Sequence, residues 1–191
     1  MTAHTMPADA VALREDQLRL GLWMFLATVT MLFAAFTSAY IVRRSGSDWR
    51  RLSLPSILWV NTVVLAASSI AVELASRSGR HRRWDRALAA FVAALALGIA
   101  FLGGQAAAWR QLVAAGVYLP SNPYSAFFYV LTGAHAIHVG AALAVLAWGA
   151  ALTRAGARDP RAWALRMELC RTFWHYLGGV WVMLFALVSL Y

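Results

Sequence analysis

The sequence contains no lysine and only one cysteine, Cys170, in 191 residues. A single cysteine excludes an intramolecular disulfide and any metal centre built from several cysteines. Charged residues make up 13% of the chain, about half their usual share in a soluble domain. All 17 basic residues are arginines, which outnumber 8 acidic residues and give a formal net charge of +9. The arginines lie in short segments between apolar runs, so we interpret them as neighbours of anionic lipid headgroups and expect no nucleic acid partner.

Hydrophobic residues, in contrast, make up 61% of the chain. They form five blocks, each long enough to cross a bilayer core, which takes roughly 20 residues. The sequence therefore predicts an all-α, polytopic membrane protein: a polar segment over residues 1–19, then one five-helix domain over residues 20–191. No cleavable signal peptide is expected, because the first apolar run is of full spanning length and has no evident small-residue cleavage site. The predicted spans are Leu20–Val42, Pro55–Ala75, Ala87–Trp109, Ser125–Leu152 and Cys170–Tyr191.

The distribution of arginines predicts the orientation. Five spans put the two termini on opposite sides of the membrane. Twelve arginines fall on the side of the N-terminus and five on the other. Short loops rich in basic residues stay in the cytoplasm. We therefore expect a cytoplasmic N-terminus and a C-terminus outside.

Two histidines, His135 and His138, lie three residues apart in the fourth apolar block and share one helix face. Ionisable groups inside a membrane are costly, so they are candidates for function. One hypothesis is haem or metal ligation, with His175 of the fifth block as a further ligand. His135 would lie ~15 Å deep but His175 only ~6–8 Å from its helix end, and zinc or copper would need further ligands nearby. We favour the other hypothesis, in which these histidines take part in hydrogen-bonded packing or contact lipid headgroups.

Four further polar residues are candidates. Glu73, in the second block, could handle protons or pair with arginines near its helix end, and we favour pairing. Glu168 is expected to precede the fifth helix and to cap its N-terminus. Asn61 and Gln105 lie inside spans and are typical of hydrogen bonds between membrane helices.

Several motifs together resemble the subunit III family of cytochrome c oxidase and other haem–copper oxidases. Residues 132–139 resemble its T-G-x-H-x-x-H-V signature, and Glu168 lies six residues ahead of Trp174-His175-Tyr176, as in its E…W-H-F motif. The order and spacing of the motifs make the resemblance specific over nearly the whole chain. The remaining matches are residues 20–26, Asn61-Thr62, Gln105 and Val180-Trp181.

The resemblance implies an accessory subunit without redox centres, bound to catalytic subunit I, to subunit II and in some complexes to small subunits or a respiratory supercomplex. Haem and copper would belong to the partners, whose reaction is reduction of oxygen to water coupled to proton pumping. The family's proposed roles are stabilising the catalytic subunit, supporting proton uptake and easing oxygen access, with phospholipids in a V-shaped cleft. The implied location is the bacterial cytoplasmic membrane.

Within this resemblance, His135 and His138 are expected to face the cleft or a neighbouring helix. Trp174, His175 and Glu168 are expected to fix the cytoplasmic end. Two positions depart from the family pattern. Val29 and Gly178 stand where many members carry carboxylates, so a proton-buffering role at those positions is not expected here.

Two alternatives to a cytochrome c oxidase subunit remain open at this point. Quinol oxidases and nitric oxide reductases have similar third subunits, and the electron donor is selected by other chains. A small transporter or membrane cytochrome b is a more distant possibility. A transporter would predict broken helices and paired charges near the midplane.

Overall fold

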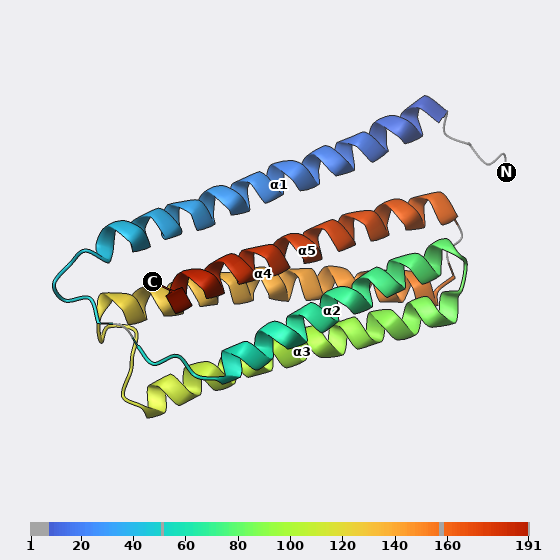
Figure 1. Cartoon of the computed structure of the whole chain (residues 1–191). Helices are drawn as coiled ribbons and strands as arrows, with labels where there is room; N and C mark the ends of the chain where they lie inside the picture. Colours follow the sequence, from blue (N-terminus) through green and yellow to red (C-terminus); the bar gives the residue numbers. More distant parts are fainter. Residues whose placement is uncertain (1–7, 51, 157–158, 191) are drawn as a thin grey trace.

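In the computed structural model, the backbone is described for residues 8–50, 52–156 and 159–190, with side chains from Leu13 onward. Within these ranges the chain is all-α. It forms five long antiparallel helices in up-and-down order: α1 Ala8–Arg43, α2 Ile57–Arg80, α3 Trp84–Ala114, α4 Pro123–Arg154 and α5 Pro160–Leu190 (Figure 1). All five are long and apolar enough to cross a membrane. The prediction of five membrane-spanning helices is confirmed.

Two helices begin well before the spans predicted for them. α1 begins at Ala8, inside the segment expected to be a polar tail, because residues 8–19 are rich in good helix formers such as Ala, Leu, Arg and Gln. α5 begins at Pro160, ten residues before the predicted span. Arginines in its first turns lower the hydropathy there but do not oppose helix formation. The helices are thus longer than the apolar blocks, and α1, with 36 residues, is about 54 Å long.

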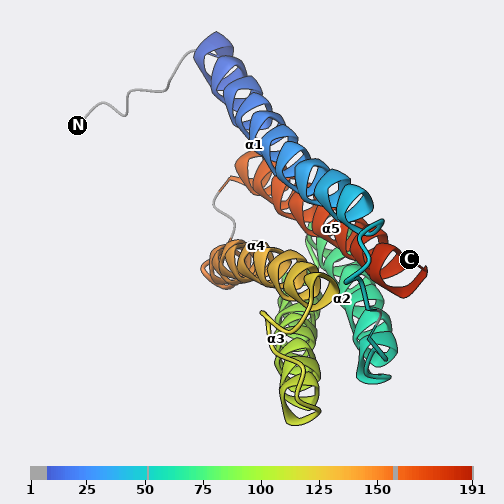
Figure 2. The same ribbon diagram turned by 90° about the vertical axis from the view of Figure 1, so that its left-hand side faces the viewer.

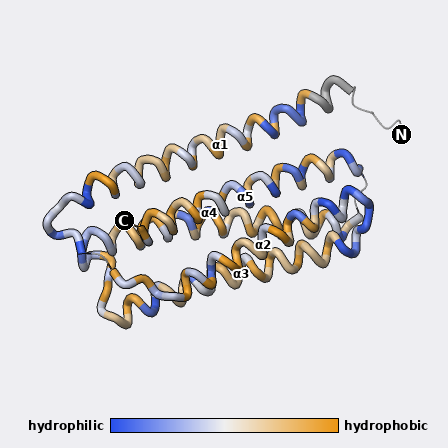
Figure 3. The backbone as a smooth tube through the Cα atoms, viewed as in Figure 1, coloured by the Kyte–Doolittle hydropathy of each residue, from blue (hydrophilic) through white to orange (hydrophobic). Residues whose placement is uncertain are grey.

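Helices α2, α3, α4 and α5 form a bundle, and α1 lies on the flank of this bundle. α2 packs on α3, α3 on α4, α4 on α5 and α5 on α2, whereas α1 packs on α4 and α5 (Figure 2). Hydrophilic residues gather at the helix ends, most densely at the end where α1, α3 and α5 begin (Figure 3). We call this the arginine-rich end. It contains Arg77 and Arg80 of α2, Arg154 of α4 and Arg161 of α5.

Large aromatic side chains fill the centre of the bundle. Trp174 and Trp181 of α5 and Phe101 of α3 are buried. Phe101 meets Trp181 edge to face, with 4.9 Å between ring centroids, a favoured geometry for aromatic pairs. The Trp174 indole lies where Gly98 leaves space on α3, because a Cβ there would come within 2.8 Å of it. Glycines in these helices therefore set how closely the helices approach.

The connections carry local signals that fix where helices begin. Asn122 caps α4: its side chain accepts a hydrogen bond from the backbone of Ser125, whose hydroxyl accepts one from Asn122, and Pro123 follows in the first turn. Asp159 caps α5 through its side chain: its Oδ1 accepts a hydrogen bond from the backbone N–H of Arg161 at 2.9 Å.

Candidate functional site

His135 lies at the centre of the protein, where four helices meet. Its side chain is 1% exposed. The imidazole lies 6.4 Å from the ring of Phe33 on α1, 6.0 Å from Phe101 on α3 and 5.4 Å from Trp181 on α5, between ring centroids. Neither ring nitrogen has a hydrogen-bond partner among the described residues. His135 therefore packs as an aromatic ring that contacts three neighbouring helices.

His138 lies on the side of α4 that faces α1. It is half-buried, its ring centroid is 5.7 Å from that of Phe33, and Nδ1 is 2.7 Å from the carbonyl oxygen of Ala134. His175 is on another helix and contacts Glu73 instead. In the part of the chain that the structure describes, no three His, Cys, Asp or Glu side chains gather as a metal site. His135 and His138 both lie against Phe33 of α1, whereas only His138 has a ring nitrogen within hydrogen-bond distance of a described atom.

The residues of the fifth-helix motif point in different directions. Trp174 is buried and faces Gly98 of α3. His175 is exposed and faces α2, with Nε2 4.0 Å from the Glu73 carboxylate. The two residues do not form one site, although they are adjacent in sequence.

Glu73 is the centre of an ion-pair cluster between α2 and α5. Its carboxylate oxygens lie 3.0 Å from Arg77 Nε, one turn along α2, and 3.3 Å from Arg171 Nη1 on α5. The arrangement corresponds to the arginine-paired alternative for Glu73. Because these side chains are partly exposed, each pair contributes only about 0.2–1 kcal/mol, but together they tie α2 to α5.

The expectation that Glu168 caps the fifth helix is wrong. Glu168 lies eight residues after Pro160, well inside α5, and its carboxylate is 3.3 Å from Arg19 Nη2 on α1. Asp159 provides the cap instead. The contact between Arg19 and Glu168 holds the first half of α1 to α5.

Asn61 and Gln105 both lie in the interior. Asn61 Nδ2 donates to the carbonyl oxygen of Phe101 at 3.0 Å and joins α2 to α3. Gly104 provides the space for the Asn61 amide, since a Cβ at Gly104 would lie 2.7 Å from Asn61 Cγ. Gln105 is buried, and its side-chain amide has no hydrogen-bond partner within the described ranges.

Sequence reasoning missed a set of hydroxyl and indole contacts that join the helices. Trp109 Nε1 donates to Thr132 at 3.1 Å, and Trp181 Nε1 donates to Thr62 at 3.0 Å. Tyr124 donates through its hydroxyl to the Val188 carbonyl at 2.5 Å. Tryptophan and tyrosine each carry a polar group that needs a partner when buried. A search for such residues inside the spans would have identified the candidates, although not their partners.

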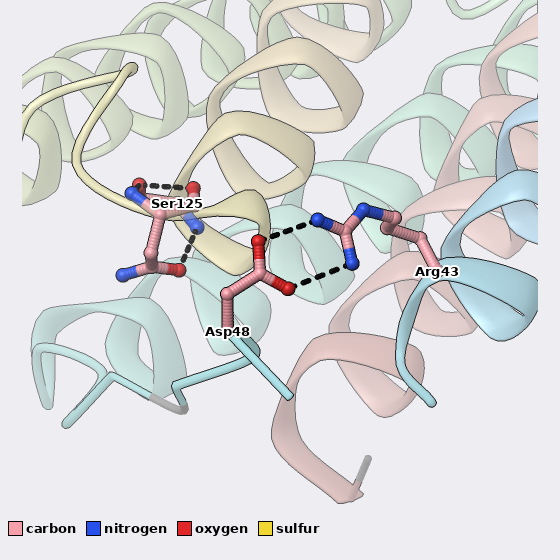
Figure 4. Close-up of polar contacts among 4 residues, drawn as sticks. Arg43, Asp48 and Ser125 are labelled. Atoms are coloured by element: carbon pink, nitrogen blue, oxygen red, sulfur yellow. Dashed lines mark hydrogen bonds and ion pairs between the residues drawn. The ribbon is translucent and has the colours of Figure 1, made fainter. Parts of the chain in front are cut away.

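An ion pair lies at the end of the protein opposite the arginine-rich end. The guanidinium of Arg43 donates two hydrogen bonds to the Asp48 carboxylate, at 2.8 and 2.5 Å, close to the capping box of Asn122 and Ser125 (Figure 4). This contact holds the pKa of Asp48 below its ordinary value, while partial desolvation opposes the shift. A hollow of about 900 Å³ lies beside it, between the end of α1 and the start of α4.

The two family positions without carboxylates are also described. Val29 is buried on α1. Gly178 of α5 faces Ser69 of α2, where an added Cβ would lie 3.7 Å from the Ser69 hydroxyl. Neither position supplies an ionisable group.

Comparisons with known proteins identify a family that this chain matches. The family described as "Cytochrome c oxidase subunit III" matches residues 2–191 of the chain. A "Probable cytochrome c oxidase subunit 3" of Mycobacterium tuberculosis (strain ATCC 25618 / H37Rv) is 29% identical, with 92% of this chain and 88% of the relative covered. A "Cytochrome c oxidase subunit 3" of Bacillus sp. (strain PS3) is 26% identical, with 100% and 95% covered. A "Cytochrome bo(3) ubiquinol oxidase subunit 3" of Pseudomonas aeruginosa is 30% identical, with 89% and 83% covered.

Proposed function

The chain belongs to the cytochrome c oxidase subunit III family, and on that premise we propose how it acts inside its complex. Members of this family are accessory subunits of haem–copper oxidases, so the chain is a non-catalytic, multi-pass membrane subunit of an oxidoreductase complex. The alternative of a small transporter or membrane cytochrome b is not favoured by this membership.

The proposed function is to stabilise the catalytic subunit, subunit I, through the outer face of α1. The observation that supports this proposal is that α1 packs only sparsely against the rest of its own chain. In the most apolar part of α1, 22% of residues are buried, against 50% in α5. Its exposed face carries large side chains that suit a second protein surface, among them Trp23, Met24 and Met31. A partner helix on this face would hold α1 in place.

Site-specific cross-linking tests this contact in the intact complex. Met31 on α1 is 73% exposed and Val63 on α2 is 68% exposed, so Met31→Cys and Val63→Cys form a matched pair. The native Cys170 is buried and does not compete for the reagent. With a photoreactive maleimide, we expect Met31→Cys to cross-link to the haem-bearing subunit and Val63→Cys to react mainly with lipid. The reverse result would refute the proposed face.

The arginine-rich end is proposed to lie in the cytoplasm, with the protein in the bacterial cytoplasmic membrane. Support comes from the arginine counts and from the up-and-down order of the helices, which brings α1, α3 and α5 to begin at one end. Labelling cysteines at Arg82 and Ser121 with an impermeant thiol reagent tests this orientation. Only the Ser121→Cys variant should react in intact cells.

A supporting role in proton uptake is proposed for the cluster at this end. His175 is exposed beside Glu73, so it can exchange protons with water. His175→Gln should slow steady-state turnover of the complex without changing haem content. The matched variant His81→Gln, in the loop after α2, should leave turnover unchanged.

Cytochrome c is proposed as the electron donor of the complex, as the family's description and the mycobacterial relative's name suggest. The Pseudomonas relative is named as a subunit of a ubiquinol oxidase. Oxygen consumption by the purified complex with reduced cytochrome c and with ubiquinol distinguishes the two. Activity with quinol alone would overturn this part of the proposal.

A further inference from the structure

Gln105 of α3 and His135 of α4 are two polar side chains inside the bundle, each only 1% exposed. Neither the oxygen nor the nitrogen of the Gln105 amide has a hydrogen-bond partner among the described residues, and neither do the two ring nitrogens of His135. A buried polar group without a partner is costly, and such groups in folded proteins are nearly always paired with protein atoms or with ordered water. These four atoms therefore point to a ligand that forms hydrogen bonds.

The packing of α3 on α4 brings the two side chains to the same level of the bundle. Trp109, one turn after Gln105 on α3, donates to Thr132 of α4 at 3.1 Å. Phe101, one turn before Gln105, lies 6.0 Å from the His135 ring between centroids. Residues four apart share a helix face, as do residues three apart. Gln105 is thus bracketed by two contacts to α4 and faces the segment between Thr132 and His135.

Thr132 supplies a third polar group at this level. Its hydroxyl donates to the carbonyl oxygen of Phe128 at 2.6 Å and accepts from Trp109. A hydroxyl oxygen has two lone pairs, so one of them remains available to a further donor. The amide, the imidazole and the hydroxyl together offer both donors and acceptors to one small ligand.

The size and chemistry of this place favour water as the ligand. The His135 ring is not in close contact on every side, since the centroids of Phe33 and Phe101 lie 6.4 and 6.0 Å from its own. A buried water takes little space and typically forms about three hydrogen bonds. Zinc or copper would need further ligands, and no three His, Cys, Asp or Glu side chains gather within the described ranges.

We infer that Gln105, His135 and Thr132 form a binding site for internal water, which links α3 to α4 at the centre of the bundle. The water accepts a hydrogen bond from the Gln105 amide and donates to a ring nitrogen of His135 and to the Thr132 hydroxyl. It holds the imidazole in one tautomer between its aromatic neighbours. The inference is independent of the proposed function, because the site lies wholly inside this chain.

A direct hydrogen bond between the amide and the imidazole is the main alternative. It would pair one atom of each group and would leave the other amide atom and the other ring nitrogen buried without a partner. Water has two donors and two acceptors, so it can pair with groups of either kind. The two alternatives differ in what lies between the side chains, which can be observed.

Electron cryo-microscopy of the intact oxidase tests the site directly, at a resolution that shows ordered waters elsewhere in this chain. We expect density for at least one water within about 3 Å of a Gln105 amide atom and of a His135 ring nitrogen. The same map of the Gln105→Leu complex should lack this density. A map with other internal waters but none between these residues, or with the amide bonded directly to the imidazole, would overturn the inference.

Thermal unfolding of the full chain in mixed micelles provides a second test with an opposite sign for the two cases. If water bridges the groups, Gln105→Leu removes one partner and leaves the imidazole unpaired, so the melting temperature should fall by roughly 2–4 °C. If nothing bridges them, the same change removes a costly unpaired amide and should raise the melting temperature. Gln111→Leu makes the same change at an exposed position of α3 and should have little effect.

A double variant separates the bridge from independent packing effects. His135→Phe alone should also lower the melting temperature, because it leaves the Gln105 amide unpaired. The double variant Gln105→Leu/His135→Phe removes both polar groups, so its melting temperature should lie above that expected from adding the two single losses. Strictly additive losses, or a rise in Gln105→Leu alone, would contradict the water site.

Discussion

Two adjacent glycines on α3 provide a matched test of how the helices are packed. At Gly104 an added Cβ would lie 2.7 Å from Cγ and 2.9 Å from Nδ2 of Asn61, whereas at Gly103 it would meet nothing within 4 Å. Both residues are inside the same helix. Gly104→Ala and Gly103→Ala therefore make the same chemical change in the same helix and differ in the space available.

The expected free energies follow from these contacts. Replacing a helical glycine by alanine gains about 1 kcal/mol of helix propensity. At Gly104 this gain is opposed by overpacking, about 1–3 kcal/mol, and by loss of the Asn61 hydrogen bond to Phe101, about 1 kcal/mol. Gly104→Ala should therefore destabilise the protein by about 1–3 kcal/mol, and Gly103→Ala should be neutral or stabilising by up to about 1 kcal/mol.

The assay is reversible unfolding of the purified chain in mixed micelles, followed by far-ultraviolet circular dichroism. A double-mutant cycle with Asn61→Ala isolates the clash, because a shorter side chain leaves room for the new methyl group. Gly104→Ala should then cost little in the Asn61→Ala background. Equal costs in both backgrounds, or equal effects of the two alanine substitutions, would refute the packing described between α2 and α3.

The remaining predictions concern polar contacts. Trp109→Phe should destabilise the chain by about 1 kcal/mol, through loss of the hydrogen bond to Thr132. Trp59→Phe, at an exposed position, should leave the free energy of unfolding unchanged in the same assay. Glu73→Gln should cost up to about 1 kcal/mol by breaking ion pairs between α2 and α5; no change in melting temperature would contradict this. The pKa of Asp48 is lowered by Arg43, so that contact is fully present above the ordinary carboxyl pKa and is lost as pH falls below about 4. The fluorescence anisotropy of a dye attached beforehand at Ser45→Cys should fall over that range as the loop loosens, and Asp48→Asn should remove the pH dependence.

Much of the fold could be predicted from the sequence because hydropathy and helix length are local properties. The five blocks each correspond to one helix, and Asn122, Pro123 and Ser125 mark the start of α4 in the sequence itself. The start of α5 was missed, because the arginines between Pro160 and Arg171 lower hydropathy without opposing the helix. For the same reason the sequence places Glu168 before the helix as a cap, whereas Glu168 lies inside α5.

The candidate site could be predicted only in part, since its geometry depends on contacts between distant helices. The spacing of His135 and His138 placed them on one face, but it did not show that one is enclosed by Phe33, Phe101 and Trp181 and the other is half-buried. The position of Glu73 near a helix end favours pairing with arginines. Its partner Arg171 lies 98 positions away, and no local pattern identifies such a pair.

The central claim is that this chain acts by packing against its partners and carries no electrons itself. Its most direct test is purification of the oxidase through a tag on this chain, followed by its dissociation from the complex in detergent. The account predicts that all haem and copper remain with the other subunits, and that the depleted complex consumes oxygen at first but inactivates sooner. A separated chain that retains haem, or a depleted complex with undiminished turnover and lifetime, would contradict it.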